Sequence, residues 1–413
     1  MIGVRVMAPP ALAAALTRDC SPWVTMPPAP RTSATVDPGI AGFDSRVLVP
    51  SGSVEDDDVS HGPEWTLIIA ESAPCDDWFP VPETVPEDGE VPRVLYVHPT
   101  DRMLWLRQHP GTGDQQVVRS AMRLVRALLR RQLQAAGAVF LPAAALAFTV
   151  RTGSRRCITL IGPSRSGKTS LLLALLDLAR QCARRAALIS NDDSTFHLTG
   201  CRPACQDHGA PALDPTRGAG SVICRGWPRG IEVRVDMIGP LGGAGRRVRS
   251  AGSTSTATLG SIYLRPESAA AITEADLAAA AHPNVLIFPS FTGPDRAGDI
   301  ELLTPRQVVE RLSGLQQLPD PIERWLDPFF LIPAEAPPPT AAATHPGTLP
   351  PATATSGAQR VVNALAALPA LQVRAPASDV LATAAALIGR IDGLDAPHGP
   401  GTADTVPPFK DPR

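Results

Sequence analysis

Two short polar segments contain the residue types best suited to chemistry, and each follows an apolar stretch. The first, GPSRSGKT at 162–169, has glycines at its first and sixth positions and then a lysine and a threonine. Such a loop can turn successive backbone N–H groups toward bound phosphate oxygens. The ammonium of Lys168 can reach the terminal phosphates of a nucleotide, and the Thr169 hydroxyl is a ligand for Mg²⁺. The spacing therefore predicts a loop that binds ATP with Mg²⁺.

The residues that we expect to contact the nucleotide lie in this loop and at the start of the next helix. They are Gly162, Pro163, Ser164, Arg165, Ser166, Gly167, Lys168, Thr169 and Ser170. A strand-like stretch precedes the loop and a helical pattern over 166–182 follows it, which is the context that the motif requires. A helix beginning there adds partial positive charge at the phosphate site.

Lysine is rare in this chain, which makes its presence in the loop informative. Only Lys168 and Lys410 are lysines among 38 basic residues, and the others are arginines. A planar guanidinium is wider than an ammonium and fits a closed phosphate loop less well. A lysine at this position therefore indicates a specific chemical requirement.

The second polar segment, Asn191-Asp192-Asp193, follows an apolar stretch at 185–190 that reads as a buried strand. Ligands of open α/β sheets bind at the carboxyl ends of strands, so we expect both carboxylates near the phosphates. A carboxylate there can accept a proton from an attacking hydroxyl or support Mg²⁺. A solvated turn without a chemical role is the alternative for such a sequence.

Two other classes of phosphate-binding protein fit less well. A GTPase carries an Asn-Lys-x-Asp motif that reads the base, and this chain lacks it. The segment RLSGLQQ at 311–317 is similar to the signature of ABC-type ATPases, but no strand ending in Asp-Glu follows it. A kinase whose acid lies on the strand after the loop's helix fits the spacing better.

The segments LPAAALAF, ITLIGPSRSGKTSLLLALL and ALISNDDS together resemble the catalytic domain of the HPr kinase/phosphorylase family and its serine kinase relatives. The resemblance covers 135–332 and, more faintly, 93–135 and 360–392. It implies transfer of the γ-phosphoryl of ATP to a hydroxyl, with a serine of a small protein, peptide or amino acid as the acceptor.

The resemblance also assigns roles by position. Asp192 would be the general base toward the serine hydroxyl, and Asp193 would support the metal and the substrate. Lys168 and Thr169 would hold the phosphates and Mg²⁺.

The chain departs from the family at one position. Pro142, in FLPAAA, stands where the family's enzymes commonly have a histidine that takes part in acid–base work. Proline cannot exchange a proton there, so phosphorolysis is not expected. The segment RGWPRGIEVR at 225–234 is the closest match to the family's second, glycine-containing signature. A catalytically weak nucleotide-binding regulatory module and a P-loop ATPase stay open as alternatives to the kinase.

Alternating strand-like and helix-like patterns predict an α/β fold, with a P-loop NTPase-like mixed sheet flanked by helices. A glycine-rich flexible loop is expected at 239–247 and a helix at 273–281. The expected organisation, in chain order, is a flexible N-terminal region at 1–63, strands and a helix that pack on the core at 64–134, the nucleotide-binding core at 135–332, a Pro/Ala/Thr-rich linker at 333–356, C-terminal helices that return to the core at 357–394, and a flexible tail at 395–413.

Composition bears on environment and partners. The net charge is −2, so bulk charge does not point to nucleic acid or acidic lipid. No apolar run is long enough to cross a membrane, and a short apolar N-terminal run broken by Pro9-Pro10 is not typical of a secretory signal. We therefore expect a cytoplasmic protein without membrane or nucleic-acid partners, and a homo-oligomer is possible.

Two further groups of residues have an open role. His197, Cys201, Cys205 and His208 are of types that zinc prefers, but their spacing is not a standard zinc-finger pattern, so a loop without metal is favoured over a zinc site. Arginines share one face of the helix predicted over 114–136, where they either steer an acidic partner or form a solvated face. They are Arg119, Arg123, Arg126 and Arg130.

A last group of arginines falls around the glycine-rich segment: Arg246, Arg247 and Arg249. In a flexible loop, such residues either act as a lid that stabilises transferring charge or, as is usual for loop arginines, only keep the loop soluble.

Overall fold

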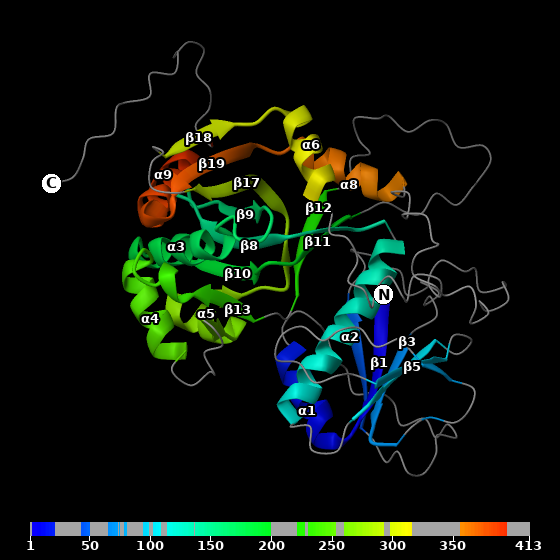
Figure 1. The fold of residues 1–413 in the computed structure, drawn as a ribbon. Coiled ribbons are helices and arrows are strands. Elements are labelled where there is room, and N and C mark those ends of the chain that lie inside the picture. The colour runs from blue at the N-terminus through cyan, green and yellow to red at the C-terminus, as the bar shows by residue number, and fades with distance from the viewer. Residues whose placement is uncertain are drawn as a thin grey trace, which may run out of the picture.

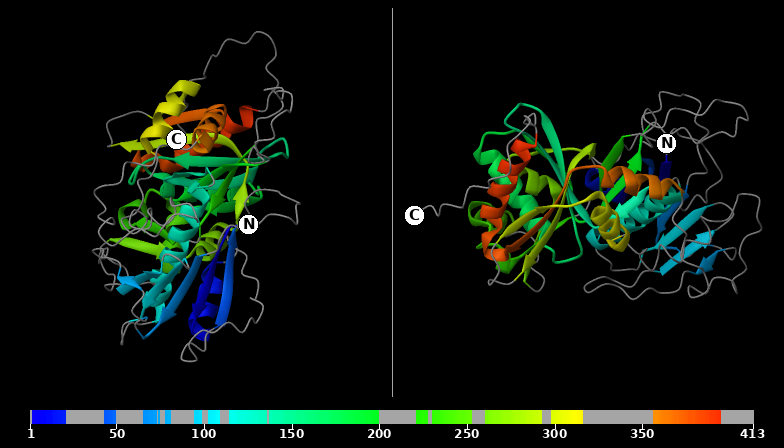
Figure 2. Two further views of the ribbon diagram at one scale, coloured as in Figure 1. Left: turned by 90° about the vertical axis from the view of Figure 1, so that its right-hand side faces the viewer. Right: turned by 90° about the horizontal axis from the view of Figure 1, so that it is seen from above.

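The computed structural model describes residues 2–20, 43–49, 65–72, 74, 78–80, 94–98, 102–108, 114–135, 137–199, 221–227, 230–252, 260–292, 298–315 and 356–394. Within these ranges the chain is mixed α/β, which confirms the predicted class. Two lobes lie side by side, one built on a seven-stranded sheet and the other on a six-stranded sheet (Figures 1 and 2).

The seven-stranded sheet carries the glycine-containing loop. Its strands, in spatial order, are β15 (Asp276–Leu277), β10 (Ala186–Ser190), β8 (Ala143–Thr149), β9 (Arg155–Ile161), β17 (Pro283–Thr292), β19 (Ala370–Pro376) and β18 (Asp299–Leu302). β8 pairs antiparallel with both β9 and β10, so β9 and β10 run in the same direction. Their carboxyl ends therefore meet at one edge of the sheet.

Helices cover both faces of this sheet. α3 (Lys168–Gln181), α4 (Gly242–Gly252), α5 (Pro266–Thr273) and α9 (Val380–Gly393) pack on one face, and α6 (Pro305–Leu315) and α8 (Ser356–Ala366) pack on the other. Successive residues of a strand point to opposite faces. Ile158 and Leu160 of β9 therefore join the core beneath α3, whereas Cys157 and Ile161 join the core beneath α6 and α8.

Smaller strands complete this lobe. β7 (Val139–Leu141), β11 (Ser194–Leu198), β12 (Val222–Gly226) and β16 (Ala280–Ala281) form a four-stranded sheet, and β13 (Ile231–Arg234) pairs with β14 (Ser261–Leu264). The helix expected at 273–281 is not formed beyond the end of α5, because Leu277 pairs with Leu188 of β10 and Ala281 pairs with Cys224 of β12.

The prediction of a flexible loop at 239–247 is also wrong, because helix α4 begins within this segment. Leu241, Ala244 and Val248 are fully buried and hold α4 on the core. Gly245 lets the helix approach the preceding turn, since a Cβ there would lie 1.9 Å from the carbonyl oxygen of Ile238. Gly245 therefore serves close packing in this segment.

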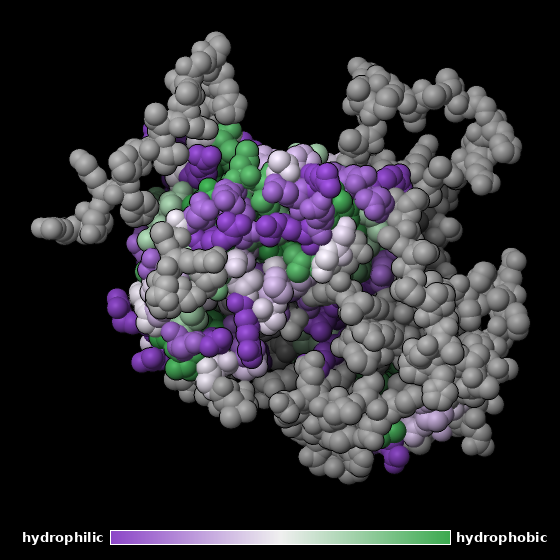
Figure 3. Space-filling model, turned by 45° about the horizontal axis from the view of Figure 1, so that its top comes forward, coloured by the Kyte–Doolittle hydropathy of each residue, from purple (hydrophilic) through white to green (hydrophobic). Residues whose placement is uncertain are grey.

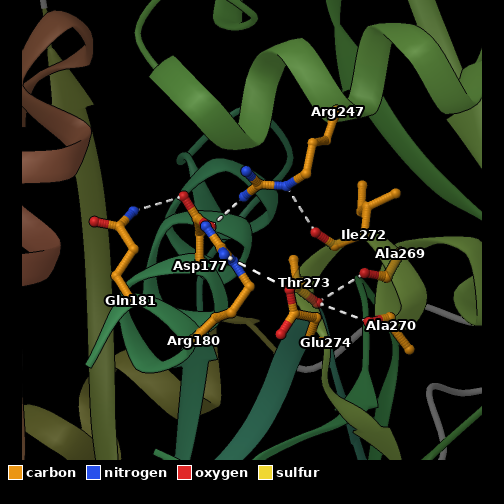
Figure 4. Close-up of polar contacts among 9 residues, drawn as sticks. All are labelled: Asp177, Arg180, Gln181, Arg247, Ala269, Ala270, Ile272, Thr273 and Glu274. Carbon is orange, nitrogen blue, oxygen red and sulfur yellow. Dashed lines mark hydrogen bonds and ion pairs between the residues drawn. The ribbon is translucent and has the colours of Figure 1, made fainter. Parts of the chain in front are cut away.

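A buried polar cluster ties α4 and α5 to α3 (Figure 4). Asp177 of α3 has a side chain that is only 1% exposed, and it accepts hydrogen bonds from Arg180 (3.0 Å), Gln181 (2.9 Å) and Arg247 of α4. The Nε of Arg247 also donates to the carbonyl oxygen of Ile272 in α5 at 2.8 Å. Arg247 is therefore bound within the fold and is not part of a lid.

The six-stranded sheet and two helices form the second lobe, which we call the N-terminal lobe. The strand order is β2 (Phe43–Val49), β1 (Ile2–Ala8), β3 (Trp65–Ala70), β6 (Met103–Arg107), β5 (Val94–His98) and β4 (Phe79–Pro80), and the helices are α1 (Pro10–Cys20) and α2 (Asp114–Ala135). Leu67 and Leu104 of the sheet pack with Leu16, Leu124 and Leu128 of the helices.

This lobe changes the expected organisation of the chain. The irregular structure expected for 1–63 does not hold at 2–20 and 43–49, because β1 pairs with both β2 and β3 and α1 packs on the shared core. Three expected segments lie outside the described residues. They are the rest of 1–63, the linker expected at 333–356 except its last residue, and the tail at 395–413.

Part of the surface is strongly polar. Figure 3 shows hydrophilic residues gathered over the upper part of the described face, with small apolar areas between them. Exposed ion pairs of the described residues include Arg306–Glu310 on α6 and Arg374–Glu301 between β19 and β18. None of the helices in the described part of the chain is long and apolar enough to span a membrane.

Candidate functional site

The glycine-containing loop at 162–167 joins the carboxyl end of β9 to the start of α3. Gly167 has a φ of +95°, and a Cβ there would lie 1.9 Å from the Phe291 ring, so only glycine fits. The Gly162 N–H donates to the carbonyl oxygen of Pro142 at 3.1 Å, and the Phe291 N–H donates to that of Ser166 at 3.3 Å. These neighbouring strands fix the curvature of the loop.

Lys168 lies inside the turn of this loop. Its ammonium donates hydrogen bonds of 2.8 Å to the carbonyl oxygens of Gly162 and Pro163. It also lies 3.4 Å from a carboxylate oxygen of Asp192, and its side chain is only 4% exposed. A buried ammonium requires such partners because it has lost its water. The structure thus brings the predicted lysine and the predicted base together.

The segment Asn191-Asp192-Asp193 begins directly after β10, at the sheet edge shared with the loop. The Thr169 hydroxyl donates to the Asn191 amide oxygen at 3.1 Å, which joins the start of α3 to this segment. Asp192 has a φ of +70°, a conformation that is uncommon outside glycine, asparagine and aspartate and that recurs at functional sites.

The two carboxylates face different surroundings. The Asp192 side chain is 38% exposed beside Lys168, whereas the Asp193 side chain is 5% exposed and lies 3.5 Å from the guanidinium of Arg126. The Ser190 hydroxyl donates to the backbone carbonyl of Asp193, which holds the turn closed. Only Asp192 is therefore accessible to a second substrate.

The sequence reasoning missed the position of Arg126 at this site. Arg130, one turn later on α2, is buried, and its guanidinium lies 4.7 Å from the centre of the Phe140 ring of β7. The arginine face of α2 is therefore turned inward at Arg126 and Arg130, which contradicts a solvated or partner-steering face there. The spacing of three or four residues between these arginines was a signal of a shared helix face, but it could not show what they contact.

Several features could hold a phosphate and a divalent cation. The Ser166 hydroxyl is buried and has no hydrogen-bond partner among the described residues. The first turn of α3 contains no acidic residue, and the first N–H groups of a helix have no acceptor within it. Thr169, its partner Asn191 and the carboxylate of Asp193 offer the oxygen ligands that Mg²⁺ prefers.

The number of carboxylates also suits Mg²⁺. In the described part of the chain, no three His, Cys, Asp or Glu side chains gather into a metal site. Mg²⁺ commonly binds one or two carboxylates together with substrate phosphates and waters, rather than an all-protein cage. One or two carboxylates beside the loop would therefore be enough for a Mg²⁺ ion that also binds phosphates and waters.

His197 of β11 is the described member of the set considered for zinc, and Cys201, Cys205 and His208 lie outside the described residues. Neither ring nitrogen of His197 has a hydrogen-bond partner among the described residues. Burial, together with the charges of Arg225 and His282, lowers the pKa of His197 to about 4. The imidazole is therefore neutral at pH 7.

We expect this histidine to make stability depend on pH. Its folded pKa of about 4 lies below the ordinary value of 6.5, so acid protonates the unfolded state first. The free energy of unfolding is therefore not lowered by this group above about pH 6.5. As the pH falls from 6.5 to 4, it decreases by about 3 kcal/mol in total. Urea unfolding at a series of pH values measures this loss.

In His197→Gln, that part of the pH dependence should disappear, whereas His98→Gln on β5 serves as the matched control and should retain it. An unchanged pH profile in His197→Gln would contradict the assignment.

No known family model matches the chain, and no curated protein is detectably similar to it in sequence. The function must therefore be inferred from the site itself.

Proposed function

We propose that this chain is an ATP-binding P-loop protein that resembles HPr kinase and transfers the γ-phosphoryl of ATP to a hydroxyl. The observation that carries the proposal is the contact of Lys168 with both its own loop and Asp192. One ammonium thereby joins the expected phosphate site to the expected base. We propose a serine of a small protein, peptide or amino acid as the acceptor.

The residues would act mainly by positioning and by neutralising charge. Lys168 would exchange its contacts with the loop carbonyls for phosphate oxygens, while the N–H groups at the start of α3 bind the same phosphates. Thr169, with Asp193 in support, would hold Mg²⁺, which neutralises phosphate charge when it is bound. The exposed carboxylate of Asp192 would orient the acceptor hydroxyl.

The transfer requires no reactant other than ATP and the acceptor hydroxyl. The acceptor oxygen forms a bond to the γ-phosphorus, and the bond from that phosphorus to the β–γ bridging oxygen breaks, which leaves ADP. The proton of the hydroxyl passes to Asp192. The Asp192 carboxylate lies 3.4 Å from the Lys168 ammonium and is 38% exposed, so an incoming hydroxyl can reach it.

A second candidate is a nucleotide-binding regulatory module or ATPase with weak transfer. Pro142 favours it, because this residue contacts Gly162 through its backbone and offers no acid–base group beside the loop. The intact pair of Lys168 and Asp192 favours the kinase.

The test is Mg²⁺-dependent transfer of the labelled γ-phosphate of ATP to free serine, serine peptides and small proteins. We expect Asp192→Asn to lower transfer by about 100-fold or more, since it removes a general base, while ATP binding is kept. Asn tolerates the positive φ at this position, so the fold should be preserved. Arg185→Gln, an exposed residue just before β10, is the control.

Transfer that is unaffected by Asp192→Asn would contradict the assigned base. ATP binding without any transfer would favour the regulatory module.

A further inference from the structure

Arg126 of α2 brings the N-terminal lobe into contact with the candidate nucleotide site, 3.5 Å from the carboxylate of Asp193. We propose that Arg126 of α2 is a positioning residue that holds Asp193 where it can support Mg²⁺. This inference rests on the proposed function and adds that the N-terminal lobe forms part of the site. A carboxylate that lost this guanidinium would lose the contact that fixes its orientation.

The burial of the pair carries the inference. The Asp193 side chain is 5% exposed and that of Arg126 is 18% exposed, with 3.5 Å between the guanidinium nitrogen and the carboxylate oxygen. A buried carboxylate is stable only with a compensating charge or hydrogen bonds. The guanidinium is planar and always charged, which suits it to fix the direction of a carboxylate.

The helix that carries Arg126 is held firmly on both sides. Leu124, Val125 and Leu128 are buried in the core of the N-terminal lobe, on the face of α2 that meets the six-stranded sheet. On the other side, Arg130 packs over Phe140 of β7. α2 therefore cannot slide without breaking one of these contacts, and the position of Arg126 is set by the lobe.

A second contact joins the same lobe to the strand that follows Asp193. The indole of Trp227 packs into the core of the N-terminal lobe, and its N–H donates to the Thr195 hydroxyl of β11 at 2.6 Å. β11 begins at Ser194, directly after Asp193. The core of the lobe therefore contacts, through Trp227, the strand that directly follows Asp193.

The adjacent carboxylates are consequently held by cations from different parts of the molecule. Lys168 of the loop holds Asp192, and Arg126 of the N-terminal lobe holds Asp193. When phosphates draw Lys168 away, Asp192 is released toward the acceptor. Arg126 does not belong to the loop, so Asp193 keeps its position.

The experiment measures ATP binding as a function of Mg²⁺ concentration and, separately, in EDTA. We expect Arg126→Gln to raise the Mg²⁺ concentration needed for half-maximal enhancement of ATP binding by about 10-fold, as for other residues that orient metal ligands. ATP binding in EDTA should not change, because it depends on Lys168 and the loop. Arg107→Gln, an exposed arginine of the same lobe, is the matched control and should behave as the unaltered protein.

A double-mutant cycle separates positioning from a general structural effect. If Arg126 acts through Asp193, then Arg126→Gln should add nothing to the Mg²⁺ dependence of Asp193→Asn. Should Arg126→Gln alone fail to fold, the comparison of Asp193→Asn with the double variant still decides.

An equal Mg²⁺ dependence in those two proteins supports the inference, and a further loss in the double variant overturns it. An Arg126→Gln protein with unchanged Mg²⁺ dependence also overturns it while leaving the proposed function intact. An unaltered protein that does not bind ATP would overturn both.

Discussion

Replacing Lys168 with alanine is expected to weaken ATP binding by at least about 30-fold, which corresponds to about 2 kcal/mol. The Lys168 side chain is only 4% exposed, so water would weaken the interaction of its ammonium with phosphate very little. Lys168→Arg should not restore binding, because the guanidinium is too wide for a turn in which the ammonium lies 2.8 Å from two carbonyl oxygens. Calorimetric titration with ATP measures both variants.

The control for these variants is Arg155→Ala, which removes an exposed positive charge at the start of β9, the strand that leads into the loop. It should leave ATP affinity unchanged. Full affinity in Lys168→Ala would show that the loop does not bind nucleotide phosphates, and the proposed function would then fail.

Replacing Arg247 with methionine is expected to lower the free energy of unfolding by about 3 kcal/mol. The change removes one donor from the buried carboxylate of Asp177 and the hydrogen bond from α4 to Ile272 of α5 (Figure 4). Asp177 has no access to water that could replace the lost partner, since its side chain is 1% exposed. Urea unfolding monitored by circular dichroism measures the difference.

A double variant tests whether the uncompensated charge causes this loss. Removing both charges with Arg247→Met and Asp177→Leu should recover much of the stability, because a buried pair can be replaced by apolar side chains at little cost. Arg180 would then remain partly exposed beside Glu274, at 3.6 Å. Arg246→Met, at the exposed neighbouring position of α4, is the control. A double variant less stable than Arg247→Met would refute the explanation.

The sequence by itself determined the local features of the site. The eight-residue motif at 162–169 predicted a turn between a strand and a helix with its lysine inside the curve, and Gly167 has the positive φ that such a turn requires. The position of Asp192 also followed from the sequence, because the carboxyl end of β10 lies one helix after the loop. Short-range order of this kind depends on residues that are neighbours in the chain.

Only the tertiary structure decided which distant residues meet these features. Arg126 contacts Asp193 across 67 positions of sequence, and Arg247 contacts Asp177 across 70. Helical spacing predicted that the arginines of α2 share a face, but the direction of that face depends on how α2 packs between two sheets. Likewise, glycines that suggest a flexible loop at 239–247 instead allow the close approach of α4 to Ile238. Packing against distant segments outweighed local preference at both places, because burial of apolar surface stabilises a fold more than the intrinsic propensity of a few residues.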